Sequence, residues 1–398
     1  MNNNSFTADQ PRSLFAAVSF SAVAVIIFNA LPVIMGVASD TLALSAEQMG
    51  AMAAAEVGGM GLTSVSGLLW IRKLPWRRAV LVGTLALAAG NVLSIFAETA
   101  STLIALRFLT GLVGEGVVFT VAIAAIGDAK NTDRAFAYSI VGQVGLGMVA
   151  LWGFPYIALA AGFAGIMCTM TVLALACLVL LPWLPAGGVK VLAPEGPALV
   201  AAGSGSNSIP LLGLLGMVCW FIGLSGIWAF LERIGMEVPM QQTSIGSLLS
   251  LGLGLGALAS LAVALIGDRY GRYWPPLAAI AAHAVLCFLF GGQLTAFAYG
   301  LMVLLITFVW NIGLPYLLGL IADSDSTGRM VVLVVTAQAF GNTLGPLVAG
   351  QVVELRGLSS VGNSSALFCL LALMILGFFI YRVRPMLALK PEAIELPI

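Results

Sequence analysis

Three ionisable side chains interrupt long apolar runs of the sequence, where they could bind and release a proton. They are Glu56, Arg107 and Glu115. An ionisable group inside a bilayer is costly unless it is paired or faces water, so such groups commonly mark ion pathways. A carboxyl group buried there favours its neutral form, as a proton carrier requires. We therefore expect Glu115, and after it Glu56, to carry a coupling proton; the alternative is a protonated side chain that joins two helices by a hydrogen bond.

Helical spacing limits how the charged residues can pair. Eight residues separate Arg107 from Glu115 by about 12 Å along a helix, so they cannot pair directly, whereas Arg107 can reach Glu56 if their helices touch. Arg107 could bind an anionic substrate through two parallel hydrogen bonds, or it could brace its helix, which we favour. Glu232 and Arg233 are adjacent and point in different directions on a helix. We predict that they do not pair and that they form an outer gate or an interfacial anchor.

The composition excludes soluble and nucleic-acid-binding classes of protein. Of the 398 residues, 60% are hydrophobic and 9% are charged, with 17 basic and 17 acidic residues. A soluble domain has about 25% charged residues, and a nucleic-acid binder needs a basic face. The chain is therefore expected to lie in a membrane and to bind no nucleic acid.

Motifs of cofactor and metal chemistry are missing from the sequence. The five cysteines lie in apolar runs without a C-x-x-C spacing, which indicates small buried side chains rather than disulfides or a zinc site. The sequence contains neither a G-x-x-x-x-G-K-[ST] phosphate loop nor an H-E-x-x-H helix, and its single histidine, His283, is expected to be structural. We expect no cofactor, no metal and no enzymatic activity, so that an ion gradient would drive any work.

Twelve apolar stretches are long enough to cross a bilayer, whose core of about 30 Å needs about 20 helical residues. The predicted spans are 14–37, 46–70, 79–97, 102–127, 135–157, 163–183, 209–231, 244–267, 275–291, 296–320, 331–353 and 365–383. The first run is too long for a cleavable signal peptide and leads directly into the second. We predict an all-α, multi-pass protein of a cell membrane, which we take to be a bacterial inner membrane.

The distribution of Lys and Arg predicts the orientation. With both termini in the cytoplasm, 14 of the 17 basic residues fall in cytoplasmic segments, while Arg233 and Arg356 lie outside and Arg107 lies within a span. Short cytoplasmic loops collect positive charge. Both termini are therefore predicted to be cytoplasmic.

The spans divide six and six around a stretch rich in Pro, Gly and Ser. Residues 184–207 have the composition of a linker, so we predict six-helix bundles over 1–183 and 208–398. The halves also repeat, because a shift of 195 residues places Asp128 on Asp323 and Gln143 on Gln338. We therefore expect two pseudo-symmetric bundles.

A tight turn between spans 8 and 9 carries a carboxylate beside two cations, Asp268 with Arg269 and Arg272. This turn resembles the D-R-x-G-R loop of the major facilitator superfamily of transporters, and the six-plus-six repeat resembles the same family across nearly the whole chain. The resemblance implies two bundles that rock around a central cavity, with this loop acting in gating.

The corresponding loop of the first half departs from the motif. Ile71 stands where the family has Asp, and Leu74 where it has Gly. Asp323 and Asp325 could replace the missing acid by facing the four cations of that loop, and the repeat mates Arg134 and Arg329 flank the same region. Those four cations are Arg72, Lys73, Arg77 and Arg78. The alternative is that they only set the topology.

Span 4 resembles the R-x-x-x-G-x-G segment of the family. Arg107 and Gly111 fit the pattern, but Gly114 and Glu115 stand one residue later than it requires. Organic-anion symporters of the superfamily carry a similar Arg with a Glu seven positions on, where this chain has eight. Exporters often carry G-x-x-x-G-P-x-x-x-G in span 5, whereas the nearest match here, residues 341–350, is in span 11. These features favour uptake over export.

In the resembled fold, spans 1, 4, 7 and 10 line the central cavity. Polar or aromatic residues on these spans are therefore candidates for the substrate pocket, although such aromatic side chains often serve only packing. Two repeat mates are added because they could hydrogen-bond across the halves. The candidates are Asn29, Arg107, Ser225, Trp228, Trp310, Asn311 and Tyr316, with Gln143 and Gln338 as the repeat mates.

These observations predict a secondary transporter that works by alternating access and is coupled to H+. The substrate would be a small organic solute, amphipathic or weakly acidic, because the pocket is mostly apolar. Uptake by symport is favoured, and export by proton antiport is the alternative; a membrane sensor or an intramembrane enzyme is the more distant one. The expected partners are the small-molecule substrate, H+ and the lipid bilayer, and we expect a monomer.

Overall fold

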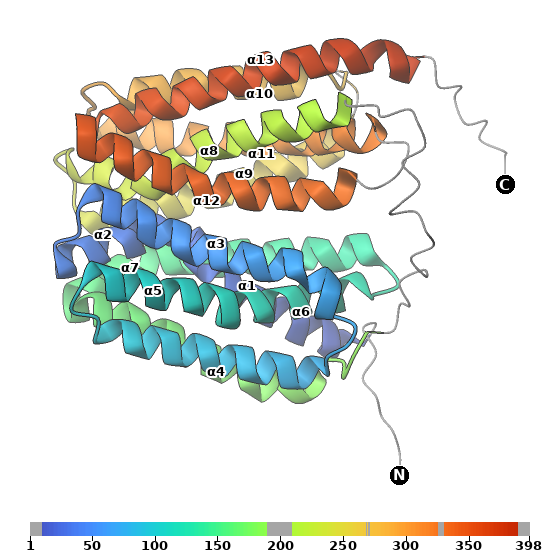
Figure 1. The fold of residues 1–398 in the computed structure, drawn as a ribbon. Helices are drawn as coiled ribbons and strands as arrows, with labels where there is room; N and C mark the ends of the chain where they lie inside the picture. Colours follow the sequence, from blue (N-terminus) through green and yellow to red (C-terminus); the bar gives the residue numbers. More distant parts are fainter. Residues whose placement is uncertain (1–9, 189–208, 268, 270, 325–329, 389–398) are drawn as a thin grey trace, which may run out of the picture.

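The computed structural model describes residues 10–188, 209–267, 269, 271–324 and 330–388, and within them every regular element is a helix (Figure 1). Within the described residues, eight helices are long and apolar enough to cross a membrane. Other predicted spans coincide with helices that are not among these eight, such as the shorter apolar helix α10 (Trp274–Phe290). The protein is a multi-pass membrane protein built of helices.

The first half begins with two helices where one span was predicted. These are α1 (Pro11–Asn29) and α2 (Leu31–Leu42), which are followed by α3 (Ala46–Trp70) and α4 (Trp76–Ile95). Pro32 lies in the first turn of α2, where a helix tolerates a residue without an N–H, and its ring and missing N–H prevent α1 from continuing through this position, so the break falls at Ala30.

Predicted span 4 also consists of several pieces. They are α5 (Ala100–Leu109), a π-helical turn over Thr110–Glu115, and α6 (Gly116–Gly127). Predicted spans 5 and 6 lie in one element, α7 (Thr132–Cys177), which joins two helices across a kink at Gly162, where φ is 60° and ψ is −153°. A 3₁₀ turn, Leu178–Trp183, follows. Only glycine adopts this backbone conformation readily, so Gly162 separates the two predicted spans.

The second half consists of long helices that match the predicted spans to within a few residues. Besides α10 they are α8 (Ile209–Met236), α9 (Gln242–Ile266), α11 (Ala296–Ser324), α12 (Met330–Arg356) and α13 (Ser360–Ala388). Their apolar sequences provide the continuous hydrophobic surface that a bilayer requires.

The helices all run in roughly the same direction or its reverse, and the two halves of the chain form two neighbouring layers (Figure 1). Within the halves, α1 packs on α7 and α3 on α5, while α8 packs on α12 and α13. Between the halves, α3 packs on α12, α7 on α9 and α2 on α8. Among the described residues, these three helix pairs make the main contacts between the two layers.

The two ends of this bundle differ in how the halves meet. We call the end at which α1 begins the near end and the end at which α2 finishes the far end. The main buried core joins α8 to the far-end residues of the first half, such as Ile34 and Phe154. The near-end residues of the first half, including Phe20 and Trp76, form a separate core cluster. The halves therefore share one core toward the far end.

Candidate functional site

The centre of the first half holds a charged group enclosed by helices. The guanidinium of Arg107 lies 2.8 Å from the carboxylate of Glu56, and both side chains have 0% exposed surface. Arg107 also donates hydrogen bonds to Asn91 Oδ1 at 3.0 Å, Ser94 Oγ at 3.1 Å and Thr110 Oγ1 at 3.1 Å. A buried charge is tolerated when it is paired and its donors are occupied. The structure thus makes the contact between Arg107 and Glu56 that helical spacing allowed.

Glu115 is the second carboxyl group of this site, and it lies beside Glu56 rather than beside the cation. Its side chain is 1% exposed, and its oxygens find no N–H or hydroxyl donor among the described residues. Glu115 and Glu56 are neighbouring buried carboxyl groups that interact electrostatically, and Glu56 Oε2 likewise has no hydrogen-bond partner among the described residues. An ionised carboxylate only accepts hydrogen bonds, so two carboxyl groups can bond only when one carries a proton. The described site therefore brings two buried carboxyl groups together with one guanidinium.

The π-helical turn brings Glu115 to this position. It covers Thr110–Glu115 and lies between Arg107 and the start of α6. A π-helical turn accommodates one extra residue in an α-helix and is frequent at functional sites. The sequence of span 4 has one residue more than the family pattern between Arg107 and Gly114, and the turn is where that residue is absorbed.

Close backbone contact between α3 and span 4 holds the carboxyl groups together. A methyl group on Gly59 would lie 2.5 Å from the carbonyl oxygen of Phe108, and one on Gly111 would meet the carbonyl oxygen of Glu56. Small residues allow membrane helices to approach to this distance. The glycines thus set the depth at which Glu56 meets Arg107.

We expect Gly111→Ala to separate these helices and lower stability by about 1–3 kcal/mol, because an added methyl group in a tight contact forces the backbone apart. The expected result is a lower midpoint of thermal unfolding of the purified protein. Gly145→Ala is the matched control, since a methyl group on Gly145 in α7 meets nothing within 4 Å. Equal midpoints for the two variants would contradict the packing role.

A second charged group joins the two halves at the far end. Arg233 of α8 lies 2.8 Å from Asp40 of α2 and also donates to the carbonyl oxygen of Gly36. Its Nε lies 3.2 Å from Glu232, which also accepts a hydrogen bond from Gln242 at 3.0 Å. The prediction that Glu232 and Arg233 do not pair was therefore wrong, because the long side chain of Arg233 folds back over its own helix. The predicted role as an outer gate or an interfacial anchor stays a prediction.

Arg233→Gln is expected to loosen the far end, because it removes the charge that links α8 to Asp40 and Gly36. We expect spin labels on α2 and α8, placed at their far ends, to show a larger population of long distances in the variant. Arg356→Gln, at the exposed far end of α12, is the control for the loss of one charge. An unchanged distance distribution would show that the pair does not hold the far end closed.

Two of the predicted pocket residues line a small cavity between α8 and α11. Trp228 and Trp310 border it together with Leu224 and Thr307, and its volume is about 10 Å³. The indole of Trp228 donates to the carbonyl oxygen of Phe28 in α1 at 3.3 Å. Pro32, four residues after Phe28, cannot supply the helical N–H that this carbonyl would otherwise accept. Trp228 of the second half thus hydrogen-bonds to the end of α1, close to the break at Ala30 in the first half.

The other pocket candidates on spans 7 and 10 are engaged in helix contacts. Ser225 donates to carbonyl oxygens of Phe221 and of Gly341 in α12. Asn311 bonds to Thr307 and accepts from Ser260 of α9, and Tyr316 donates to the carbonyl oxygen of Gly267. These three side chains therefore do not gather with the two tryptophans.

Asn29 and Gln143 lie together in the first half. The amide of Asn29 donates to the backbone carbonyl of Gln143 at 3.0 Å, and the Gln143 side chain donates to Ser139 and Ser21. The described hydrogen bonds of Gln143 therefore stay within its own half instead of crossing to the other. Its repeat mate Gln338 is partly buried in α12.

The near end reproduces the sequence repeat as a pair of ion pairs. Arg72 bonds to Asp128 through two hydrogen bonds of 2.9 and 3.0 Å. Arg272 lies 2.6 Å from Asp323, the repeat mate of Asp128. In each half, an arginine of the loop after the second predicted span therefore pairs with an aspartate that follows the fourth predicted span.

The gate predicted between Asp323 and the cations of the first-half loop stays a prediction. Arg134 donates to Tyr138 on its own helix. Arg269 is among the described residues of the turn after α9. Asp268, Asp325 and Arg329 lie outside the described residues.

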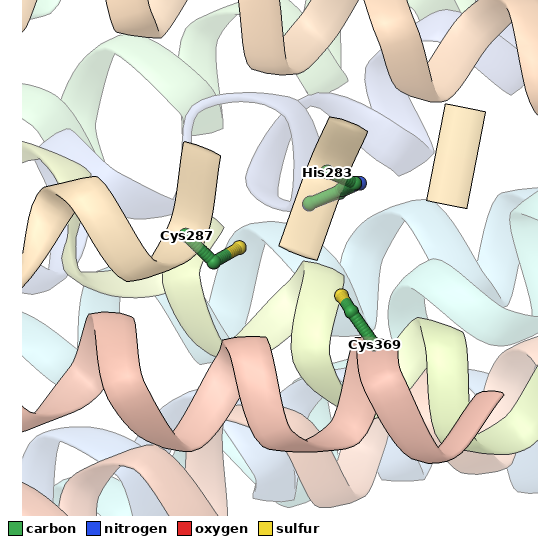
Figure 2. A group of neighbouring side chains, drawn as sticks. All are labelled: His283, Cys287 and Cys369. Atoms are coloured by element: carbon green, nitrogen blue, oxygen red, sulfur yellow. The ribbon is translucent and has the colours of Figure 1, made fainter. Parts of the chain in front are cut away.

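His283 lies in the core of the second half with two cysteines. Figure 2 shows His283 and Cys287 on α10 and Cys369 on α13, and their ligand atoms lie within 4.8 Å of one another. The indole of Trp220 donates to His283 Nδ1 at 3.3 Å, which places the ring proton on Nε2. The structural role expected for His283 stays a prediction.

Sequence inspection missed the polar partners that surround Arg107. Asn91 and Ser94 lie in predicted span 3 and Thr110 in predicted span 4, and all three are buried. Polar residues deep in a predicted span were the available signal, since such side chains need partners in an apolar interior. Asp40 was missed because it follows the end of predicted span 1.

The fold and the buried ion group define a class of protein: a polytopic membrane protein with two layers of helices and an ionisable site within one of them. The model of the Major Facilitator Superfamily matches residues 14–326, and the chain belongs to this superfamily. It is a secondary transporter in the general sense of that family.

Solved structures support the fold. The D-xylose-proton symporter is similar with a TM-score of 0.74 and 12% identity, covering 92% of this chain and 96% of its own. The nucleoside transporter NupG is similar with a TM-score of 0.68 and 14% identity, covering 92% and 98%. A search of curated proteins found no match.

Proposed function

We propose that the chain is a proton-coupled transporter that takes up a small organic solute by alternating access. The observation that carries this proposal is the carboxyl pair of Glu56 and Glu115 beside Arg107. Two acids and one base, all enclosed, have no net charge only when one acid is protonated. A site that is neutral with a proton and charged without it supports a role in coupling.

The proposed topology has twelve spans with both termini in the cytoplasm. Two six-helix bundles, residues 1–183 and 208–398, would be joined by a linker at 184–207. The proposal draws support from helices within all the predicted ranges and from the positive charge of the loops on one side. The near end would then face the cytoplasm, and the protein would lie in a bacterial inner membrane.

The two tryptophans are the proposed centre of the substrate site. Trp228 and Trp310 border the small cavity between α8 and α11, and Trp228 contacts α1 across the interface of the halves. Opening of that interface would enlarge a pocket with flat apolar walls and few polar groups. Such a pocket favours an organic solute with an apolar surface.

The shared core at the far end supports alternating access. The far-end helices of the two halves pack in one core with the ion pair of Arg233 and Asp40, whereas the near-end part of the first half has a core of its own. A rocking movement of the two halves would part them at the far end and bring them together at the near end.

Transport into proteoliposomes under an imposed pH gradient tests the proposal. A panel of organic solutes is first screened for thermal stabilisation, because a ligand that binds only the folded state raises its stability. A stabilising solute should then accumulate when the outer medium is acidic and should carry protons inward with it. Accumulation driven by the opposite gradient would indicate antiport, and binding without gradient-driven flux would indicate a sensor or an enzyme.

A further inference from the structure

A large pocket at the near end of the second half lies outside the proposed transport site. It has a volume of about 920 Å³ and lies between the start of α10 and the last part of α13. These two helices pack on each other at the edge of the layered bundle (Figure 1). The pocket therefore opens toward the bilayer rather than toward the interface of the halves.

Two guanidinium groups give the pocket its charge. Arg382 and Arg384 line it, and the described lining residues include no carboxylate. Arg384 stacks over Tyr273 at 5.9 Å from the ring centroid, and Arg382 over Phe378 at 5.8 Å. Stacked arginines keep their N–H groups free to bind phosphate oxygens in pairs.

Aromatic residues place the pocket at the level of a membrane surface. Trp274 and Tyr381 line it and are 72% and 74% exposed. Trp and Tyr favour the boundary between headgroups and acyl chains. Basic pockets between membrane helices at that level bind anionic headgroups.

An apolar path leads away from this pocket along α13. Leu277 and Ile380 form part of its wall, and Gly377 leaves it open because a side chain there would meet nothing within 4 Å. Four large apolar residues continue the same face of α13 at helical spacing, and each of their side chains is between 49% and 66% exposed. They are Phe378, Met374, Leu370 and Leu367.

We propose that this pocket binds an anionic phospholipid, with its phosphate on Arg382 and Arg384 and one acyl chain along the exposed face of α13. The geometry separates a charged end from an apolar stripe, as a phospholipid does. The two arginines select the negative headgroup, and the aromatic residues hold it at the boundary. This proposal depends only on the chain lying in a membrane, so it can hold whether or not the chain couples protons.

Native mass spectrometry of the full chain in detergent tests the proposal with phosphatidylglycerol and phosphatidylcholine as probes. Each arginine near a charged lipid surface contributes about 1 kcal/mol, so the double variant Arg382→Gln with Arg384→Gln should bind phosphatidylglycerol at least about tenfold more weakly. Binding of phosphatidylcholine should be weak and unchanged. The control, Arg12→Gln with Arg78→Gln, removes the same charge at the near end outside the pocket and should retain binding.

A second measurement locates the lipid. Phosphatidylglycerol with brominated acyl chains should quench the fluorescence of Trp274, so that less quenching is seen with Trp274→Phe than with the wild type. Inorganic phosphate at millimolar concentration should not displace the lipid. Equal binding by the pocket and control variants, equal binding of both lipids, or displacement by phosphate would overturn the proposal. Thermal unfolding in phosphatidylcholine checks that all variants are folded.

Discussion

Glu115→Gln is expected to abolish proton-coupled accumulation of the substrate while leaving its binding intact. The amide has nearly the size of a protonated carboxyl group and can donate a hydrogen bond to Glu56, so the packing of the buried site is preserved. It cannot release a proton, however, so the cycle of protonation ends. Accumulation under a pH gradient should fall to the level of liposomes without protein, whereas exchange of labelled for unlabelled substrate should continue.

The comparison with Glu98→Gln separates this effect from a general loss of negative charge. Glu98 is exposed in the loop between α4 and α5, and its variant should accumulate substrate like the wild type. Proton movement is followed at the same time with a dye that reports internal pH. Coupled proton and substrate uptake that survives in Glu115→Gln would rule out the proposed role of this residue.

Arg107→Met is expected to destabilise the protein by about 3–5 kcal/mol, the usual cost of leaving one partner of a buried ion pair alone. Arg107 is the single cation among the described groups of the site, and it also occupies the oxygens of Asn91, Ser94 and Thr110. Its loss leaves all four acceptors without their donor. The midpoint of thermal unfolding should fall strongly, and less folded protein should be recovered from membranes.

Removal of Glu56 in the same molecule should restore part of this loss. The double variant Glu56→Gln with Arg107→Met has no buried charge at the pair, and replacing both partners of such a pair is often nearly neutral. A double-mutant cycle on the two single variants and the double variant isolates the interaction. Strictly additive effects would show that the pair does not act as a unit. Arg107→Lys should rescue less than fully, because one ammonium cannot occupy four separated acceptors.

The helices were predictable from sequence because the bilayer imposes their length and composition. The predicted range 46–70 coincides with α3 (Ala46–Trp70), and predicted span 8 agrees with α9 to within two residues at each end. What could not be predicted were the local departures from helix geometry. The sequence of span 4 showed an extra residue before Glu115, but only the structure shows that a π-helical turn absorbs it.

The candidate site was predictable in part for the same reason. An ionisable residue in an apolar run is visible in the sequence, and the spacing of Arg107 and Glu115 correctly excluded a direct pair. The neighbours of a side chain depend on which helices touch, so the contact of Glu115 with Glu56 and the three polar partners of Arg107 could not be derived. For Glu232 and Arg233, residue spacing wrongly excluded a pair. The two side chains leave the helix in different directions, but the side chain of Arg233 is long enough to reach Glu232.

The hydrogen bond between Trp228 and Phe28 links opening of the far end to hydration. Pro32 has no N–H, so it cannot donate the helical hydrogen bond that the Phe28 carbonyl oxygen would otherwise accept. The indole of Trp228, on the other half, donates to this oxygen instead. If the halves part there, this oxygen must be met by another donor, and an unsatisfied buried carbonyl costs about 1–3 kcal/mol. Water or a substrate hydroxyl entering the gap would remove that cost. A dry opening of the far end is therefore penalised, and an arriving solute that offers a donor at this point would lower the barrier to its own admission.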